Sequence, residues 1–318
     1  MTNANQNLPE ARSIRAGIAF MCVGVLFLVG LDVAARWLLQ TYSLTQLIFL
    51  RCTFSVVLIL AVAAGRGQLG ALRTARPGWH VTRSLLMAGS MLTFFHALRF
   101  IPLADIVIFV FAAPLIVTAL SQPFLGERVG PLRWGAVVVG FAGVIVVLRP
   151  GSGSVHPAAI YAVIGAAFYA GLGLTARKLS PTESTLSLSL FPFFAPLIIA
   201  GVQCVQGWQT PDMLGWALFF VCGVLGGLGI VCVNAAYQRA PVAIIVPFEY
   251  TALLWAATAG FLVWGEIPDR FAWIGAAIIT ASGLFILWRE TLAPPVPDAA
   301  RPNFPLQEAA GTDPDPRE

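Results

Sequence analysis

The sequence predicts an all-helical membrane protein, and three observations lead to this fold class. First, 58% of the 318 residues are hydrophobic and only 11% are charged, whereas soluble domains carry about 25% charged residues. Second, the apolar residues form ten runs of roughly the length that a membrane-spanning helix requires. Third, the runs lack the period-2 alternation of a membrane barrel. Because lipid offers no partner to backbone amides, helices remain as the way to cross.

The ten predicted spans follow one another along most of the chain. They lie at 14–36, 45–64, 81–99, 103–124, 132–148, 157–176, 185–205, 213–237, 242–263 and 271–288. The segment 1–13 is expected to be a cytoplasmic tail. The segment 291–318 is rich in proline and acidic residues and lacks apolar periodicity, so it is expected to be a disordered tail.

Basic residues predict the orientation of the chain. If the N-terminus lies in the cytoplasm, the inner loops hold nine arginines and lysines and the outer loops hold four. Because basic loops remain on the cytoplasmic side, both termini are expected there. The basic residues are spread over several loops, which does not indicate a nucleic-acid partner. The inner set is Arg66, Arg73, Arg76, Arg83, Arg128, Arg133, Arg177, Lys178 and Arg239, and the outer set is Arg36, Arg99, Arg149 and Arg270.

An internal repeat divides the chain into two halves. The segment "GVLFLVGLDVAAR" at 24–36 aligns with "GAAFYAGLGLTAR" at 165–177, and "ALRFIPLADIVIF" at 97–109 aligns with "AYQRAPVAIIVPF" at 236–248. The halves, 14–150 and 157–290, hold five spans each. An odd number of spans makes the second copy enter the membrane from the opposite side. The sequence therefore predicts inverted five-helix repeats, an arrangement typical of secondary transporters, with the substrate site between the halves.

Three longer segments resemble a known family. They are "PLADIVIFVFAAPLIVTALSQPFLGERVG" (102–130), "APVAIIVPFEYTALLWAATAGFLVWGE" (240–266) and "IGAAIITASGLFILWRE" (274–290). Together with the repeat, they make the chain similar to ten-helix, EamA-type members of the drug/metabolite transporter superfamily over residues 14–290. The resemblance implies a multi-pass carrier of the bacterial inner membrane that moves a small molecule by alternating access, in many members by export of amino acids or other metabolites.

Two other classes of membrane protein are alternatives to a carrier. A duplicated helical bundle also fits a channel, or an enzyme that acts on a lipid substrate. The sequence contains no metal-spaced cluster of His, Asp and Glu and no local Ser/His/Asp signature. The five cysteines also lack CxxC spacing, so neither a metal nor another cofactor is expected. The oligomeric state is left open.

Prolines and glycines predict local departures from straight helices. Pro192 and Pro196 should kink the span at 185–205, while Pro114 and Pro247 should bend or open their spans, because each removes a backbone donor. Gly223 and Gly227 in "GVLGGLG" should permit a close helix contact.

Charged residues inside predicted spans are the first candidates for a substrate site, because each costs about 2.5–3.5 kcal/mol or more at mid-helix. Asp32 has Arg36 four residues on, so a local ion pair is as good an explanation as substrate binding. Arg51 has no acidic neighbour in its span and stays charged at any accessible pH. Its partner must be a ligand carboxylate or an aspartate of another span, and Asp32 and Asp105 are both candidates.

Aromatic residues and one histidine complete the predicted substrate-binding set. His96 lies where a titratable group could respond to the outside pH, although a core histidine bonded to a backbone carbonyl is an alternative. Apolar, aromatic pockets with a few polar groups are typical small-molecule sites. The set comprises Glu249, Arg51, Asp32, His96, Tyr250, Phe27 and Tyr169.

Glu249 in "VPFEYTALLW" is the strongest of these candidates. The positions three and four residues away on its helix hold Val246, Ile245, Ala252 and Leu253, so no local ion pair explains it. Its counterpart in the first repeat is Val110, which indicates that the fold itself does not require a carboxylate there. We expect Glu249 to face a central cavity and to bind a cationic group or a coupled proton, and a protonated glutamate bonded to a neighbouring helix is the alternative.

Inverted repeats make a prediction about topology. The pairs Gly126–Glu127 and Gly265–Glu266 end the fourth span of each half, and their repetition predicts a structural role at the helix end, outside the substrate site. Because Glu127 and Glu266 occupy equivalent positions, residue 127 should face the cytoplasm and residue 266 the outside. In a variant without native cysteines, a membrane-impermeant thiol reagent on intact cells should label a cysteine at 266 and spare one at 127. Equal labelling of the two positions would contradict the inversion.

Overall fold

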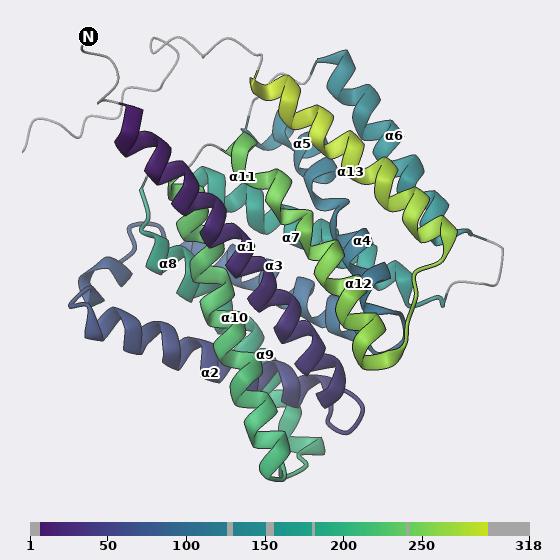
Figure 1. Ribbon diagram of the computed structural model, residues 1–318. Helices are drawn as coiled ribbons and strands as arrows, with labels where there is room; N and C mark the ends of the chain where they lie inside the picture. Colours follow the sequence, from purple (N-terminus) through teal and green to yellow (C-terminus); the bar gives the residue numbers. More distant parts are fainter. Residues whose placement is uncertain (1–6, 126–129, 151–155, 180–181, 240–241, 292–318) are drawn as a thin grey trace, which may run out of the picture.

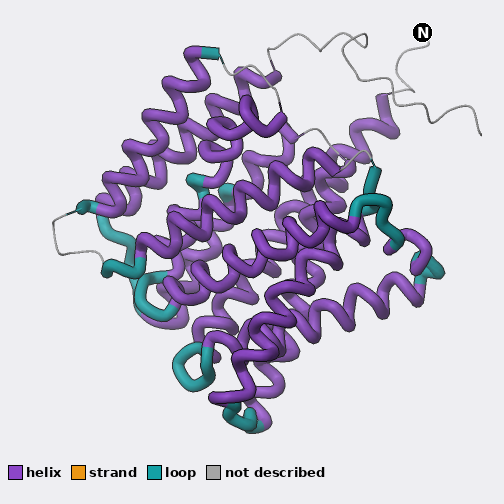
Figure 2. Tube along the Cα trace, turned by 180° about the vertical axis from the view of Figure 1, so that it is seen from behind, coloured by secondary structure: helices purple, strands orange, loops and turns teal. Residues whose placement is uncertain are grey.

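The computed structural model describes residues 7–125, 130–150, 156–179, 182–239 and 242–291, and every regular element among them is helical (Figures 1 and 2). The longer helices are α1 (Asn7–Leu38), α2 (Leu44–Gly65), α3 (Pro77–Leu98), α4 (Leu103–Val110), α5 (Ala113–Leu125), α6 (Pro131–Leu148), α7 (Ala159–Leu179), α8 (Thr185–Leu190), α9 (Phe194–Cys204), α10 (Met213–Arg239), α11 (Val242–Glu249), α12 (Thr251–Trp264) and α13 (Arg270–Thr291). Short 3-10 turns are η1 (Leu69–Leu72), η2 (Phe191–Phe193) and η3 (Val205–Gly207).

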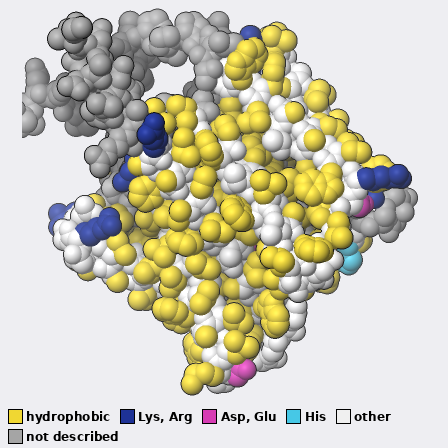
Figure 3. Space-filling view, viewed as in Figure 1, with side chains coloured by type: hydrophobic (Ala, Val, Ile, Leu, Met, Phe, Trp, Pro, Cys, Tyr) yellow, Lys and Arg dark blue, Asp and Glu magenta, His cyan; other side chains and the backbone are white. Residues whose placement is uncertain are grey.

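Eight helical stretches in the described part of the chain are long and apolar enough to cross a membrane. They are Ile14–Leu38, Leu44–Gly65, Leu103–Phe124, Pro131–Leu148, Ala159–Ala176, Thr185–Gly207, Met213–Tyr237 and Arg270–Arg289. The other two predicted spans coincide with α3, which buries the polar His80 and Arg83, and with α11 and α12, which are separate helices. Figure 3 shows a largely apolar face with Lys and Arg near its margins. The predicted helical membrane protein is confirmed.

Two predicted spans are broken near their middle. The segment 103–124 divides at Phe111 and Ala112, just before Pro114, and the segment 242–263 divides at Tyr250, after Pro247. In each, a proline lacks the N–H group that a continuous helix needs. The rings of Phe111 and Tyr250 lie 4.7 Å apart at their centroids, so the two breaks meet each other.

The span at 185–205 is interrupted as its prolines predict. Helix α8 ends at Leu190, the η2 turn carries Pro192, and α9 continues from Phe194. Helix α1 begins at Asn7, and the part of it that is apolar enough to cross a membrane begins at Ile14, as predicted.

The helices pack in a regular set of pairs. Helix α1 lies along α10, and α3 lies along α7. Helix α6 packs against α13, and α2 packs against α9 (Figure 1). Helix α4 packs against α12, whereas α5 and α11, within the residues that the structure describes, are not closely packed together.

Glycines allow the closest of these contacts. A Cβ atom on Gly24 of α1 would lie 3.0–3.1 Å from atoms of Val233, Cys232 and Gly229 in α10. The expected role of "GVLGGLG" is confirmed as well: a Cβ on Gly223 would overlap Phe54 of α2, and one on Gly227 would come within 3.0 Å of Leu58. Small residues at helix contacts are the usual basis of association in lipid.

The Gly265–Glu266 pair ends α12 and ties it to α1. Gly265 adopts a left-handed conformation (φ 68°), and its N–H donates to the Phe261 carbonyl. This C-cap favours glycine. The Glu266 carboxylate then accepts two hydrogen bonds of 2.5 Å from the Arg36 guanidinium, which also lies 4.4 Å from the Trp264 ring centroid. The structural role expected at this helix end is observed, while Gly126 and Glu127 lie outside the described residues.

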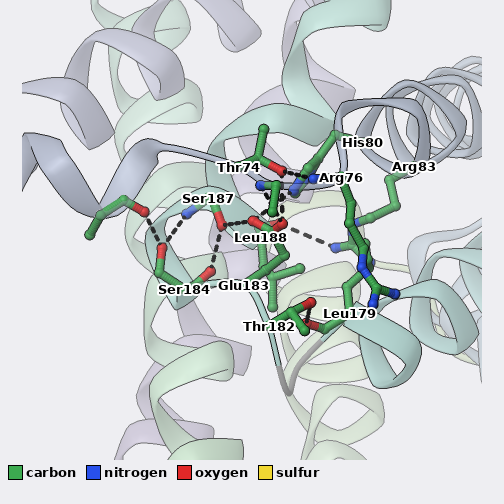
Figure 4. Close-up of polar contacts among 12 residues, drawn as sticks. Thr74, Arg76, His80, Arg83, Leu179, Thr182, Glu183, Ser184, Ser187 and Leu188 are labelled. Carbon is green, nitrogen blue, oxygen red and sulfur yellow. Dashed lines mark hydrogen bonds and ion pairs between the residues drawn. The ribbon is translucent and has the colours of Figure 1, made fainter. Parts of the chain in front are cut away.

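A buried polar cluster joins three segments around Glu183 (Figure 4). Thr74 and Ser187 donate side-chain hydrogen bonds to its carboxylate at 2.8 and 3.2 Å, and His80 Nε2 lies 3.3 Å from it. Burial would raise the pKa of the Glu183 carboxyl group, but these partners outweigh burial and hold the pKa below its ordinary value.

Glu183 should therefore make stability depend on acid pH. The carboxylate stabilises the fold above the ordinary glutamate pKa of about 4.3, and this contribution is lost as the pH falls through the lower pKa of the folded protein. Glu183→Gln should cost about 1–3 kcal/mol near neutral pH. Its difference in Tm from the wild type should shrink as the pH falls below about 4. Asp298→Asn in the C-terminal segment serves as the control, and a pH-independent difference would contradict the assignment.

Candidate functional site

Arg51 is a buried arginine in the middle of the helical bundle. Its residue surface is only 6% exposed, and its Nε atom lacks a hydrogen-bond partner among the described residues. The guanidinium lies 5.1 Å from the ring centroid of Phe95 on α3. Gly226 on α10 leaves room for it, because a Cβ there would lie 3.3 Å from both Nε and Nη2. The positive charge of Arg51 therefore lies against an aromatic ring and against a stretch of helix backbone that carries no side chain at Gly226.

Asp32 is the acidic residue of α1 that faces the same region. It is 9% exposed and close enough to Arg51 for electrostatic interaction. Within the described residues, however, Asp32 makes neither a hydrogen bond nor an ion pair. Of the two aspartates considered as partners for Arg51, Asp32 is the one nearby. Asp105 instead has Arg149, Glu266 and Asp269 as its charged neighbours.

The local pair between Asp32 and Arg36, which the sequence offered, does not form. Arg36 binds Glu266 with both terminal nitrogens. A bidentate arginine–carboxylate pair is stronger than a single contact, because two parallel hydrogen bonds fix its geometry. The partner lies 230 residues away in the chain, so residue spacing along one helix could not predict this pair.

Glu249 lies at the last residue of α11 and is half-buried. The hydroxyl group of Tyr237 on α10 donates a hydrogen bond to its Oε1. Tyr169 on α7 is near enough to feel its charge. The neighbouring Phe248 packs against an apolar cluster that includes Met21 and Val25 of α1. Glu249 is therefore held where α10 and α11 meet, near α1 and α7.

Arg51 and Glu249 lie at different depths along α10. Gly226 lies against Arg51, whereas Tyr237 donates a hydrogen bond to Glu249. At 1.5 Å per residue, the interval from Gly226 to Tyr237 corresponds to about 16 Å along the helix axis. The opposite charges are thus spaced along the bundle and do not form one ion pair.

The remaining members of the predicted set lie in several places. His96 faces α7, with its ring 4.6 Å from Tyr161 and 5.3 Å from Phe100 at the centroids. The Tyr250 hydroxyl is buried against Gly283 of α13. Phe27 is half-buried, and Tyr169 is 43% exposed. The structure thus brings Asp32 to Arg51 and Tyr169 to Glu249, and it places His96 in a separate aromatic cluster.

Sequence reasoning did not find Tyr237, Gly226 and Phe111 as partners of the predicted residues. Tyr237 is 12 residues from Glu249 and on another helix, so local spacing gives no signal. Phe111 could have been found, because the repeat alignment that pairs Val110 with Glu249 also pairs Phe111 with Tyr250.

Comparison with known proteins gives the family. The sequence model of the EamA-like transporter family matches the chain twice, at residues 15–149 and 156–288. The chain belongs to the EamA-like transporter family. It is a metabolite transporter of the drug/metabolite superfamily, as the sequence resemblance implied.

Several relatives of this EamA-like transporter carry substrate names. An S-adenosylmethionine uptake transporter of Rickettsia bellii is 27% identical, with 87% of this chain and 95% of the relative covered. A riboflavin transporter of Vibrio cholerae is 30% identical over 78% and 84%, and a pseudopaline exporter of Pseudomonas aeruginosa is 27% identical over 76% and 85%. A solved crystal structure matches with a TM-score of 0.63 at 18% identity, and the match covers 89% of this chain and 99% of the other chain. This similarity supports the fold alone.

The geometry predicts opposite effects for two arginine substitutions. Arg51→Met removes a buried charge that forms no ion pair within the described residues, and it should leave Tm unchanged or higher, because replacing a buried charge by a well-packed apolar side chain is often neutral or stabilising. Arg36→Met leaves Glu266 unpaired and should cost about 1–3 kcal/mol. Thermal unfolding of the purified variants measures both. Equal losses would mean that Arg51 is also one half of a structural pair.

Proposed function

We propose that this transporter moves a small amphipathic or zwitterionic metabolite across the bacterial inner membrane by alternating access. Arg51 binds an anionic group of the substrate, and Glu249 binds a cationic group or a coupled proton. The observation that carries the proposal is the buried guanidinium of Arg51, whose Nε has no protein acceptor among the described residues. A permanent, buried cation of this kind attracts a ligand carboxylate or phosphate.

The names of the relatives support the chemical class. S-adenosylmethionine, which the Rickettsia protein is named for, combines a carboxylate, cationic groups and an aromatic base. Such a molecule matches opposite charges that are spaced along a helix bundle and accompanied by aromatic rings. The relatives include an uptake transporter and an exporter, so the proposal specifies alternating access for either direction. Export is the direction that the family resemblance implied.

The pattern of helix pairs supports ten spans in two inverted halves. Exchanging the halves converts the α1–α10 contact into the α7–α3 contact, and both occur. It converts α6–α13 and α2–α9 into themselves. The predicted excess of basic residues in inner loops favours both termini in the cytoplasm, and the proposal takes 14–150 and 157–290 as the repeats and the flanking segments as tails.

One further pair supports alternation between two states. Exchange of the halves converts the α4–α12 contact, which is present, into α5–α11, which is not close among the described residues. The α4–α12 end is also the end at which Arg36 binds Glu266. One end of the bundle is therefore the more tightly closed, and the symmetry-related arrangement would close the other end.

Counterflow in proteoliposomes tests the proposal. Radiolabelled S-adenosylmethionine should accumulate in proteoliposomes that contain the unlabelled compound. Its accumulation should exceed that of riboflavin, which is uncharged at neutral pH. Arg51→Lys should reduce the rate about tenfold, or about 1.4 kcal/mol, because lysine lacks the bidentate fork. Glu249→Gln should abolish transport or its pH dependence while leaving Tm nearly unchanged.

Arg66→Lys alters an exposed arginine at the end of α2 and should behave like the wild type. Transport by both site variants at the wild-type rate, at every pH, would remove Arg51 and Glu249 from the site. Non-saturating flux without counterflow would favour a channel, and turnover of a lipid without transport would favour an enzyme.

A further inference from the structure

A pocket of about 450 Å³ opens at the start of α3, away from the candidate substrate site. It is lined by Arg76, Gly78, Trp79 and Thr82. The Nζ atom of Lys178, in the last turn of α7, lies 4.3 Å from the centroid of the Trp79 ring. An arginine, an indole and a hydroxyl group therefore line the pocket, and the lysine of α7 lies against that indole.

The charge around the pocket is positive and unopposed. No aspartate or glutamate occurs in the sequence between Asp32 and Asp105. Arg76 forms no side-chain ion pair within the described residues. The acidic residue of this region, Glu183, is buried and already bound by Thr74, Ala75 and Ser187 (Figure 4). Within the described residues, Arg76 and Lys178 therefore remain outside any ion pair and are available to an anion in the pocket.

The surface beyond the pocket is apolar and exposed. Val81 and Leu85, which follow on α3, are 59% and 54% exposed. Gly78, Thr82 and Leu85 recur at intervals of four and three residues, so they lie on one face of the helix. Trp79 stands at the polar end of this face, as indoles do at membrane interfaces. The pocket thus combines a cationic end with an adjacent apolar surface. This combination is complementary to a phospholipid, which has an anionic headgroup and acyl chains, and not to a free ion.

We propose that this pocket binds the phosphate group of an anionic phospholipid. Arg76 and Lys178 contact the headgroup, Thr82 and the Trp79 indole border it, and the acyl chains lie along Val81 and Leu85. The proposal rests on the orientation given above, in which the start of α3 lies at the cytoplasmic interface. Basic side chains at this interface bind anionic lipids of the cytoplasmic leaflet.

Lipid-dependent thermal stability of the purified full-length protein tests the proposal without any transport substrate. A ligand that binds the folded state raises its Tm. Phosphatidylglycerol added to protein in a neutral detergent should raise Tm by about 3 °C. Phosphatidylcholine with the same acyl chains should not. The double variant Arg76→Gln, Lys178→Gln should lose most of this rise, while Arg66→Gln, a matched change outside the pocket, should keep it.

Each alternative result has a definite meaning. An equal rise with inorganic phosphate alone would mean that the occupant is a soluble anion and would overturn the lipid assignment. A rise that survives in the double variant would place the lipid elsewhere, and no rise in the wild type would exclude the site. Because the readout is binding, its failure would leave the transport proposal untouched, and a failed counterflow experiment would leave this one standing.

Discussion

Close approach of helix backbones is the constraint on which the rest of the structure depends. Lipid removes the hydrophobic force that drives helices together in water, so packing must come from small residues that allow contact. Helix α10 meets this requirement on two sides, with Gly229 against α1 and Gly223 and Gly227 against α2. The same approach creates the candidate site, because Gly226 leaves the space in which the Arg51 guanidinium lies. Packing and binding thus use one glycine-rich stretch.

Much of the architecture could be predicted because it follows from local rules. Hydrophobic run length located the apolar helices, proline located the interruption after Leu190, and the Gly265–Glu266 dipeptide marked a helix end. The division of the predicted spans at Phe111 and at Tyr250 was harder to locate. Proline indicates that a helix opens nearby, but the residue at which it breaks depends on what packs there, and here the two breaks pack on each other.

The candidate site was less predictable, because its contacts join distant helices. Asp32 and Arg51 were both selected as charges in apolar segments, and they are near each other. Arg36 does not pair with Asp32, because Glu266 from the other half of the chain binds Arg36. Asp32 therefore has Arg51 as its basic neighbour, which the local sequence could not show. Likewise, Glu249 stood out for its lack of local partners, yet Tyr237, which binds it, lies on another helix. Spacing along one helix carries no information about such contacts.

The contact between Phe111 and Tyr250 and the Arg36–Glu266 pair would affect different properties of a carrier of this kind. The first would affect the stability of both states, and the second the ratio of their populations. Phe111 and Tyr250 are counterparts in the two halves, so exchange of the halves converts the contact into itself. In the proposed alternating-access cycle, the contact would therefore persist whichever end is open. Removing a ring there would weaken both states alike and leave their ratio unchanged. The Arg36–Glu266 pair differs, because exchange of the halves does not convert it into itself and it lies at the end closed by the α4–α12 contact. Its loss would shift the population toward the state open at that end, to the extent of its own free energy.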